Sequence, residues 1–246
     1  MRSIPLAFAL FLAACSSPDA ASSDATPSSP DLSTGAEEAT PSGFDAQAWL
    51  AEAREVAVGI YDIDLEDDTA TDRMKELAGE LNEVADWRRI CDTYLDYETG
   101  EPVYDPIAPG EGSWARGTLE TGDISETEAV VAVTCDFGAY QGGYAFVHIA
   151  ADRVALLTTP GLDENGQPTG REQGIYGTPD FSEVGTGFIS TFAKARGLGD
   201  CGIYVRYAMG EGSTLSAVEV RQRDCGMDIP DDLPPPSEWP LVYSAG

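Results

Sequence analysis

Cys201 is the residue whose surroundings most suggest chemistry, because it lies in the glycine-rich stretch KARGLGDCGIYVRY, residues 194–207, just ahead of a strand-like run. A reactive thiolate needs a base or a cation beside it. The chain contains a single histidine, His148, and the nearest cation along the sequence is Arg196. The residues therefore favour a disulfide cysteine at position 201, with an activated nucleophile as the alternative that Arg196 leaves open.

His148 itself lies in YAFVHIA, where strand alternation places it on one face with Tyr144 and Phe146. A lone histidine in this setting is more often a hydrogen-bonded packing residue than a ligand or a base. A histidine-rich zinc site is excluded, and a Ser-His-Asp triad is disfavoured. The chain has no P-loop, no dinucleotide fingerprint and no G-x-S-x-G elbow. We therefore predict no catalytic residues, no metal and no cofactor.

Acidic residues are abundant and raise the question of calcium. The run from Asp62 to Asp72 has the composition of a calcium loop, but the sixth and twelfth places of an EF-hand hold Asp67 and Arg73 instead of glycine and glutamate. A solvated acidic loop is favoured there. DENG, residues 163–166, is better explained as a hairpin turn.

The stretch CDFGAYQGGYAF, residues 135–146, is the best candidate for a binding surface. Tyrosine presents a large rigid area with a polar tip, and here the side chains flank paired glycines. The residues of this predicted surface are Tyr140, Gln141, Tyr144 and Arg196. The alternative is a glycine-rich strand end whose tyrosines pack on the sheet.

Five cysteines are present, and Cys15 belongs to the N-terminal segment described below. The other four form an even set: Cys91, Cys135, Cys201 and Cys225. In an oxidising compartment such a set forms disulfides, and three pairings are open to it. Residues 203–209 and 214–222 read as two strands joined by a short turn, which would bring Cys201 beside Cys225. We favour that pair, and Cys91–Cys135 then follows by elimination.

The N-terminus resembles that of a bacterial lipoprotein. Arg2 precedes a short apolar run, too short to span a bilayer, that ends in LAAC. We predict a signal peptide over residues 1–14 and diacylglycerol on Cys15, so that lipid anchors the chain to a membrane facing the periplasm. Ser16 slightly favours the outer membrane. The alternative is an ordinary secretory signal. Residues 15–43 contain little that is apolar and predict a disordered tether about 30 Å from end to end.

Downstream of the tether the pattern indicates one α+β domain. Apolar residues recur at helical spacing from Trp49 and again from Met74, with Ser42 as a cap, which predicts a helical segment over 44–90 packed on a sheet. Short alternating runs separated by Gly, Pro, Asp and Asn predict a mainly antiparallel β region over 91–246, a meander or a sandwich. The proline-rich tail is predicted to be a strap with Trp239 docked.

The formal charge of −29 limits the partners. Nucleic acid and anionic lipid surfaces would be repelled, so we expect a basic protein or a neutral glycan. Solubility in a salty medium is the simplest reason for so much acidic charge.

Four elements of the C-terminal half together resemble a known family. CDFGAYQGGYAF, ISTFAKARGLGDCG, a hairpin closed by Cys225 and Gly226, and WPLVY are similar in order and spacing to the C-terminal part of the bacterial envelope family catalogued as domain of unknown function 1176. The resemblance covers about residues 128–243. It implies a secreted, largely β protein in which Cys201 pairs with Cys225, and it implies no activity.

The sequence therefore predicts a membrane-anchored envelope lipoprotein that acts as a non-enzymatic binding module. Inhibition of a basic envelope hydrolase such as a lysozyme is one version, because an acidic body is steered toward a cationic enzyme. The alternatives are a carboxylate-dependent glycan hydrolase and a structural envelope protein.

Overall fold

The computed structural model describes residues 43–58, 63, 68–95, 102–107, 112–139, 141–163, 165–172, 174–210, 214–226 and 232–245. The helices in this part are α1 (Ala46–Val56), α2 (Asp68–Ala85) and α3 (Arg88–Cys91), with 3-10 turns η2 (Val184–Thr186) and η3 (Pro236–Glu238). The first strands are β1 (Thr93–Leu95), β2 (Pro102–Tyr104), β3 (Leu119–Ser125), β4 (Glu128–Phe137), β5 (Gly142–Ile149), β6 (Val154–Leu157) and β7 (Pro160–Leu162). The remaining strands are β8 (Pro168–Glu172), β9 (Ile175–Tyr176), β10 (Thr178–Asp180), β11 (Phe188–Lys194), β12 (Gly202–Met209), β13 (Leu215–Arg223) and β14 (Leu241–Ser244).

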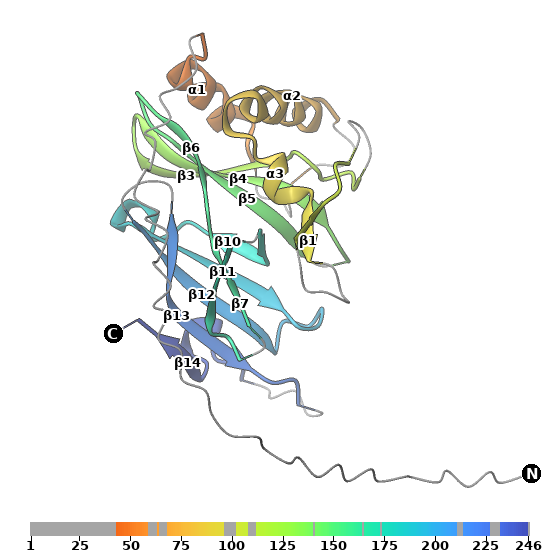
Figure 1. Cartoon of the computed structure of the whole chain (residues 1–246), viewed down its shortest axis with the longest axis vertical. Coiled ribbons are helices and arrows are strands. Elements are labelled where there is room, and N and C mark those ends of the chain that lie inside the picture. The colour runs from red at the N-terminus through yellow and green to blue at the C-terminus, as the bar shows by residue number, and fades with distance from the viewer. Residues whose placement is uncertain are drawn as a thin grey trace, which may run out of the picture. The chain divides into compact units, whose positions relative to one another are not determined.

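Two five-stranded sheets account for most of these strands (Figure 1). The first sheet has the order β3-β4-β5-β6, and β9 also pairs with β5. The second has the order β10-β11-β12-β13-β14. The paired strands of both sheets run antiparallel. The predicted fold class, mainly antiparallel α+β with N-terminal helices and disulfides, is confirmed.

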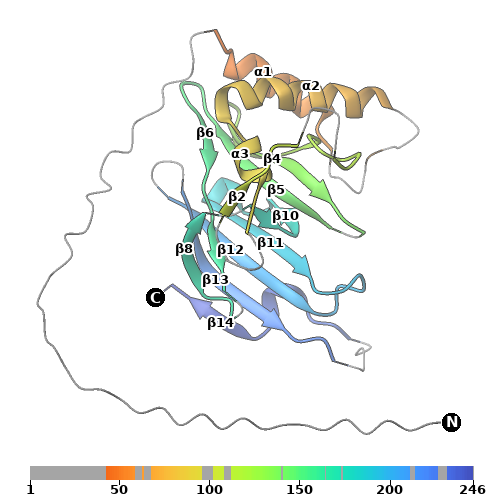
Figure 2. The same cartoon turned by 45° about the vertical axis from the view of Figure 1, so that its right-hand side comes forward.

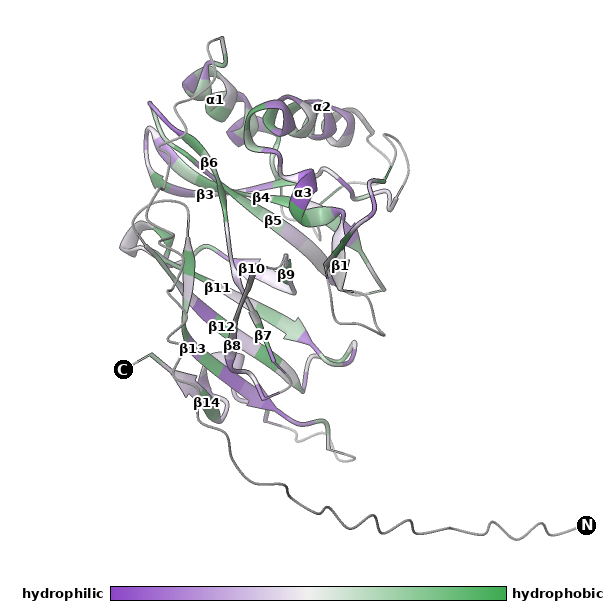
Figure 3. Cartoon of the chain, viewed as in Figure 1, coloured by the Kyte–Doolittle hydropathy of each residue, from purple (hydrophilic) through white to green (hydrophobic). Residues whose placement is uncertain are grey.

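Helices and sheets form three layers. Val131 and Val133 of β4 pack with the helices, whereas Val130 and Ala132 point into a second core that the second sheet completes. Figures 1 and 2 accordingly show α1 and α2 on one side of the first sheet and β11–β13 on the other. Because β4 is covered on both faces, it is apolar almost throughout (Figure 3).

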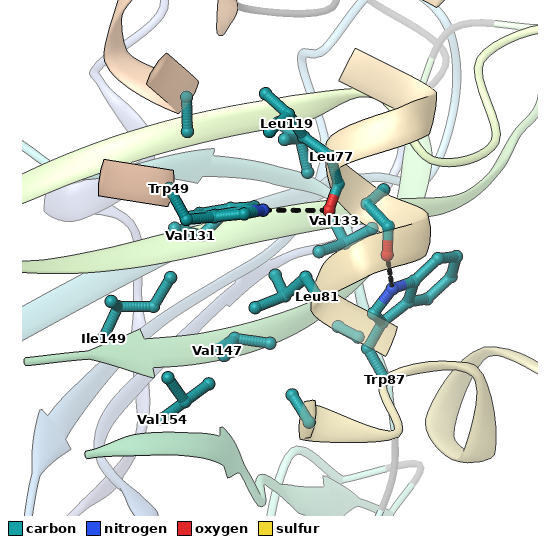
Figure 4. Close-up of a cluster of buried hydrophobic side chains, with 14 of the residues drawn as sticks. Trp49, Leu77, Leu81, Trp87, Leu119, Val131, Val133, Val147, Ile149 and Val154 are labelled. Carbon is teal, nitrogen blue, oxygen red and sulfur yellow. Dashed lines mark hydrogen bonds between the residues drawn. The ribbon is translucent and has the colours of Figure 1, made fainter. Parts of the chain in front are cut away.

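Two buried tryptophans join the other parts of the helical layer to α2 (Figure 4). The indole N–H of Trp49 donates to the Leu77 carbonyl at 3.1 Å, and that of Trp87 donates to the Ala78 carbonyl at 2.7 Å. Each buried donor is thus satisfied by α2. The cap of α1 is Asp45, whose Oδ1 accepts from the amides of residues 47 and 48, and not Ser42 as predicted.

The C-terminal tail is a strap, as predicted. Trp239 is 1% exposed and meets Phe192 edge to face at 5.3 Å. After Pro240 the chain forms β14, which pairs with β13 at the edge of the second sheet. The described prolines of the strap lie outside the strands, where a missing N–H is tolerated: Pro234, Pro235, Pro236 and Pro240.

Both predicted disulfides are present, in the pairing that the hairpin favoured. Cys91–Cys135 joins α3 to β4, and Cys201–Cys225 closes the β12–β13 hairpin. Their sequence separations of 44 and 24 residues correspond to about 4 and 3.5 kcal/mol of stabilisation in the chain-entropy model. None of the helices in the described part of the chain is long and apolar enough to cross a membrane.

Candidate recognition surface

The two stretches that the sequence singled out meet in the structure. Gln141 follows the β4–β5 turn, and its amide donates to the Lys194 carbonyl at 2.9 Å while accepting from the Lys194 amide at 2.6 Å. The side chain therefore continues the hydrogen-bond pattern of β11 in place of a strand. Gln141 is only 3% exposed, so it links the two sheets and does not contact a partner, contrary to the prediction.

Tyr144 also lies elsewhere than predicted. It is 2% exposed and packs in the core between the sheets, which is the alternative that the sequence left open. The physical reason is that the second sheet covers the face of β5 on which Tyr144 and Phe146 lie. Tyr140 lies outside the described residues.

The chain crosses from one sheet to the other beside this turn. Tyr176 pairs with Gly143 of β5, and two residues later Thr178 pairs with Phe192 of β11. Gly177 joins them at φ +129°, where a Cβ would lie 2.7 Å from the Phe192 backbone. Only glycine fits this close approach.

Three aromatic side chains surround the β4–β5 turn, and we call them the aromatic surface: Trp114, Phe137 and Tyr176. Trp114 is 45% exposed and meets Phe137 edge to face at 5.9 Å. Tyr176 is 55% exposed. Its hydroxyl lies beside Gly138 of the turn, 3.4 Å from the position that a Cβ on this glycine would take. Large aromatic side chains this exposed are typical of contact surfaces.

Sequence reasoning missed Trp114 and Tyr176. Both stand next to glycine or serine, in GEGSWARG and QGIYG, and neither belongs to an alternating apolar run. That lack of a core pattern is the signal that could have identified them.

Arg196 holds the β11–β12 loop together. Its guanidinium donates to Asp200 Oδ1 at 2.7 Å, to Oδ2 of the same carboxylate and to the Gly226 carbonyl at 3.2 Å. The hydrogen bonds from Arg196 lower the pKa of Asp200 below its usual value; burial opposes this, and the charge of Arg223 adds to it. The Arg196 side chain is 33% exposed, and its hydrogen bonds fix the loop that carries the exposed Leu198.

Two other buried titratable groups of the described residues are held in similar pairs. Asp92 is bound by Arg116, which also donates to the Cys135 carbonyl at 2.9 Å. His148, 8% exposed, lies between Glu128 at 2.7 Å and Arg153 at 2.9 Å. It is a hydrogen-bonded packing residue.

Neither calcium-like stretch forms a metal site in the described residues. Asp163 uses Oδ1 to accept from the amides of Asn165 and Gln167, both at 2.8 Å, which makes it the turn residue of the β7–β8 hairpin. Four acidic residues of the run from Asp62 to Asp72, namely Asp62, Asp64, Glu66 and Asp67, lie outside the described residues, and Asp72 is exposed on α2.

These features define a class: a three-layered, disulfide-bonded α+β protein with an aromatic surface beside the β4–β5 turn. A family model described as protein of unknown function (DUF1176) matches residues 113–245. The chain belongs to this family. The match begins at the residue before Trp114 and includes the β4–β5 turn, the β11–β12 loop and the strap. The helices α1, α2 and α3 lie outside it. A search of the curated proteins finds no match, and a search of the solved structures finds none either.

Proposed function

We propose that this protein is a non-enzymatic binding module of the bacterial envelope and that it holds a glycan on the aromatic surface. The exposure of Trp114 and Tyr176 beside the β4–β5 turn is the observation that carries the proposal. Aromatic faces pack against the apolar faces of sugar rings, while the ring hydroxyls and the tyrosine hydroxyl keep polar partners.

The aromatic surface is held rigidly, which supports a binding role. Cys135, two residues before Phe137, is fixed to α3 by a disulfide, and Gln141 on the other side of the turn is fixed to Lys194. The main-chain amide of Phe137 also donates to Ser113 Oγ at 3.2 Å, next to Trp114. Little ordering is needed on binding when a surface is built in advance.

A hydrolytic role has less support. Glycoside hydrolysis needs two carboxylates across a bond, one of them with a raised pKa. The buried carboxylates of the described residues, Asp92 and Asp200, are each bound to an arginine, and the pKa of Asp200 is lowered. Both carboxylates are therefore engaged in structural pairs.

The envelope location rests on the N-terminal sequence. We propose cleavage after residue 14, lipid on Cys15 and a tether over residues 15–43, with the outer membrane favoured by Ser16. Replacing Cys15 with serine is expected to abolish labelling by radioactive fatty acid and to shift the protein from the membrane fraction to the soluble fraction. Labelling that persists in the serine variant contradicts the anchor.

The glycan proposal is tested with the full chain in detergent and a neutral oligosaccharide, the hexamer of N-acetylglucosamine. Calorimetry is expected to show binding that Trp114→Ala and Tyr176→Ala each weaken by about tenfold, the effect of removing a central aromatic contact. Leu241→Ala is the matched control, because Leu241 is 53% exposed on the distant edge strand β14. Equal losses in all three variants would contradict the role of the aromatic surface.

The same preparation tests the alternatives. Release of soluble fragments from peptidoglycan, lost in a single Asp or Glu variant, would replace the binding module by a hydrolase. Inhibition of lysozyme at low ionic strength that weakens as salt is added would favour the acidic inhibitor, since a charge of −29 steers a cationic enzyme.

A further inference from the structure

Gly143 of β5 is a glycine that neither the backbone nor the packing requires. Its φ lies outside the left-handed region, and a Cβ on it would meet its nearest neighbours at 3.8, 3.9 and 4.0 Å, which is ordinary van der Waals contact. Gly142 beside it differs, because a Cβ there would lie 2.8 Å from the Asp136 carbonyl oxygen. A glycine inside a strand costs stability and often marks a place where a ligand approaches the backbone.

The bulge opposite Gly143 does not account for the glycine. The register shifts between Thr134 and Asp136, so the extra residue of the bulge is Cys135, which belongs to β4 and not to β5. A Cβ on Gly143 would lie 3.9 Å from the Cβ of Cys135, so the two would fit side by side. Gly143 is only partly buried, and its backbone is therefore accessible to a ligand.

Two side chains flank this glycine. The register pairs Gly143 with Asp136 of β4 on one side and with Tyr176 of β9 on the other, and directly opposite residues of antiparallel strands share a face. Tyr176 Cδ2 lies 3.8 Å from the position of a Cβ on Gly143, in agreement with this placement. The backbones of Asp136 and Tyr176 are thus about 10 Å apart, or two strand spacings, and the residue between them has no side chain.

Asp136 presents a carboxylate that is oriented but not neutralised. Its Oδ1 accepts from the Phe137 amide at 2.8 Å, and the residue is exposed. It forms no salt bridge with any described residue. Arg116 donates to the carbonyl of the preceding Cys135, but its salt bridge is with Asp92. The Oδ2 atom of Asp136 is therefore available to a donor on a ligand, and its charge repels an anionic ligand.

We propose that an uncharged sugar ring lies over Gly143, packs against Tyr176 and donates a hydroxyl or acetamido N–H to Asp136. The inference rests on the proposed function and narrows its ligand to neutral glycans, because Asp136 excludes acidic ones. A hydrogen bond to a carboxylate is about twice as strong as one between neutral groups, so Asp136 adds both affinity and selectivity. Gly143 serves the ligand, since a side chain there would occupy the place of the ring.

The first test compares two oligosaccharides and two variants of the full chain in detergent, by calorimetry. The probes are the hexamer of N-acetylglucosamine and the same hexamer with its C6 hydroxyls oxidised to carboxylates. Asp136→Asn removes the charge at nearly constant volume. Asp180→Asn is the matched control, because Asp180 is another exposed strand residue whose Oδ1 accepts from a nearby amide, that of Ser182 at 2.8 Å.

We expect the wild type to bind the neutral hexamer about tenfold more tightly than the oxidised one at low salt. Asp136→Asn is expected to weaken binding of the neutral hexamer by about tenfold and to strengthen that of the oxidised hexamer by about threefold. Asp180→Asn should change neither by more than about twofold, because its charge is screened from the site.

The second test replaces the glycine. Gly143→Leu is expected to weaken binding of the neutral hexamer by more than about tenfold while the unfolding midpoint stays constant or rises, since a strand glycine has been removed. Gly185→Leu is the matched control, because Gly185 lies in η2 and a Cβ on it would meet no atom within 4 Å. If Gly143→Leu lowers the midpoint, Gly143→Ala replaces it, with an expected loss of affinity of about threefold.

The outcomes separate this inference from the proposed function. If the oxidised hexamer binds as tightly as the neutral one, if Asp136→Asn and Asp180→Asn behave alike, or if the Gly143 variants keep the affinity of the wild type, the inference is overturned. The glycan-binding function then still stands on the Trp114→Ala and Tyr176→Ala results. If neither hexamer binds, the glycan-binding function falls and the inference falls with it.

Discussion

Replacing Asp92 with alanine is expected to lower the free energy of unfolding by about 3–5 kcal/mol, the cost of leaving a buried cation without its partner. The Asp92 side chain is 1% exposed and that of Arg116 is 10% exposed. Arg116 also lies 5.7 Å from the Trp87 ring and donates to the Cys135 carbonyl at 2.9 Å, two contacts that it would lose by turning into water. Urea denaturation with both disulfides intact measures the effect as a shift of the midpoint at constant slope.

Two controls make the Asp92 result specific. Asp123→Ala removes the partner of Arg54 from an exposed pair of 2.8 Å and should cost about 0–1 kcal/mol. The double replacement Asp92→Leu with Arg116→Met removes both charges and should recover most of the loss, since no buried charge is then left unpaired. If Asp92→Ala and Asp123→Ala shift the midpoint equally, the buried pair is not the source of stability that its burial implies.

Replacing Trp239 with alanine is the second change with a large expected effect, about 3–5 kcal/mol for loss of a buried indole. The indole packs edge-on against Phe192, and its N–H donates to the Pro234 carbonyl at 3.0 Å. Without it, the strap loses its attachment to the second sheet and β14 should separate from β13.

Hydrogen exchange measured at individual amides tests whether β14 separates from β13. Amides at the β13–β14 pairing should exchange faster in Trp239→Ala, while the amides that join β4 to β5 keep their protection. Trp239→Phe retains the ring contact without the indole N–H and should recover part of the stability. Unchanged protection at Val220 and Tyr243, which pair across β13 and β14, would show that the strand holds without the strap.

The order of the strands was largely predictable from local patterns. The runs EAVVAVTCDF and GIYVRYAM coincide with β4 and β12, because apolar alternation bounded by turn residues reflects the backbone geometry directly. The Cys201–Cys225 pair was accessible for the same reason, since a hairpin brings its two ends together. Such features depend on residues close in sequence.

The recognition surface was less predictable because exposure depends on residues far away in sequence. The pattern around Tyr144 gave its alternation with Phe146 correctly, yet only the position of the second sheet determines that this face is buried. Gln141 is withdrawn from the surface by a backbone 53 residues further along the chain. Trp114 and Tyr176 become neighbours of one turn only through the β5–β9 pairing and the packing of Phe137.

The placement of the two disulfides has a mechanical consequence. One bond lies within the helices and the first sheet, the other within the second sheet, and neither connects the two sheets. Tension applied between α1 and the second sheet would therefore act on non-covalent contacts alone, because α1 and α2 precede Cys91 and lie outside both disulfide-closed loops. Each sheet would keep its covalently closed segment under load, so the domain would extend by a limited amount and could recover when the tension is released.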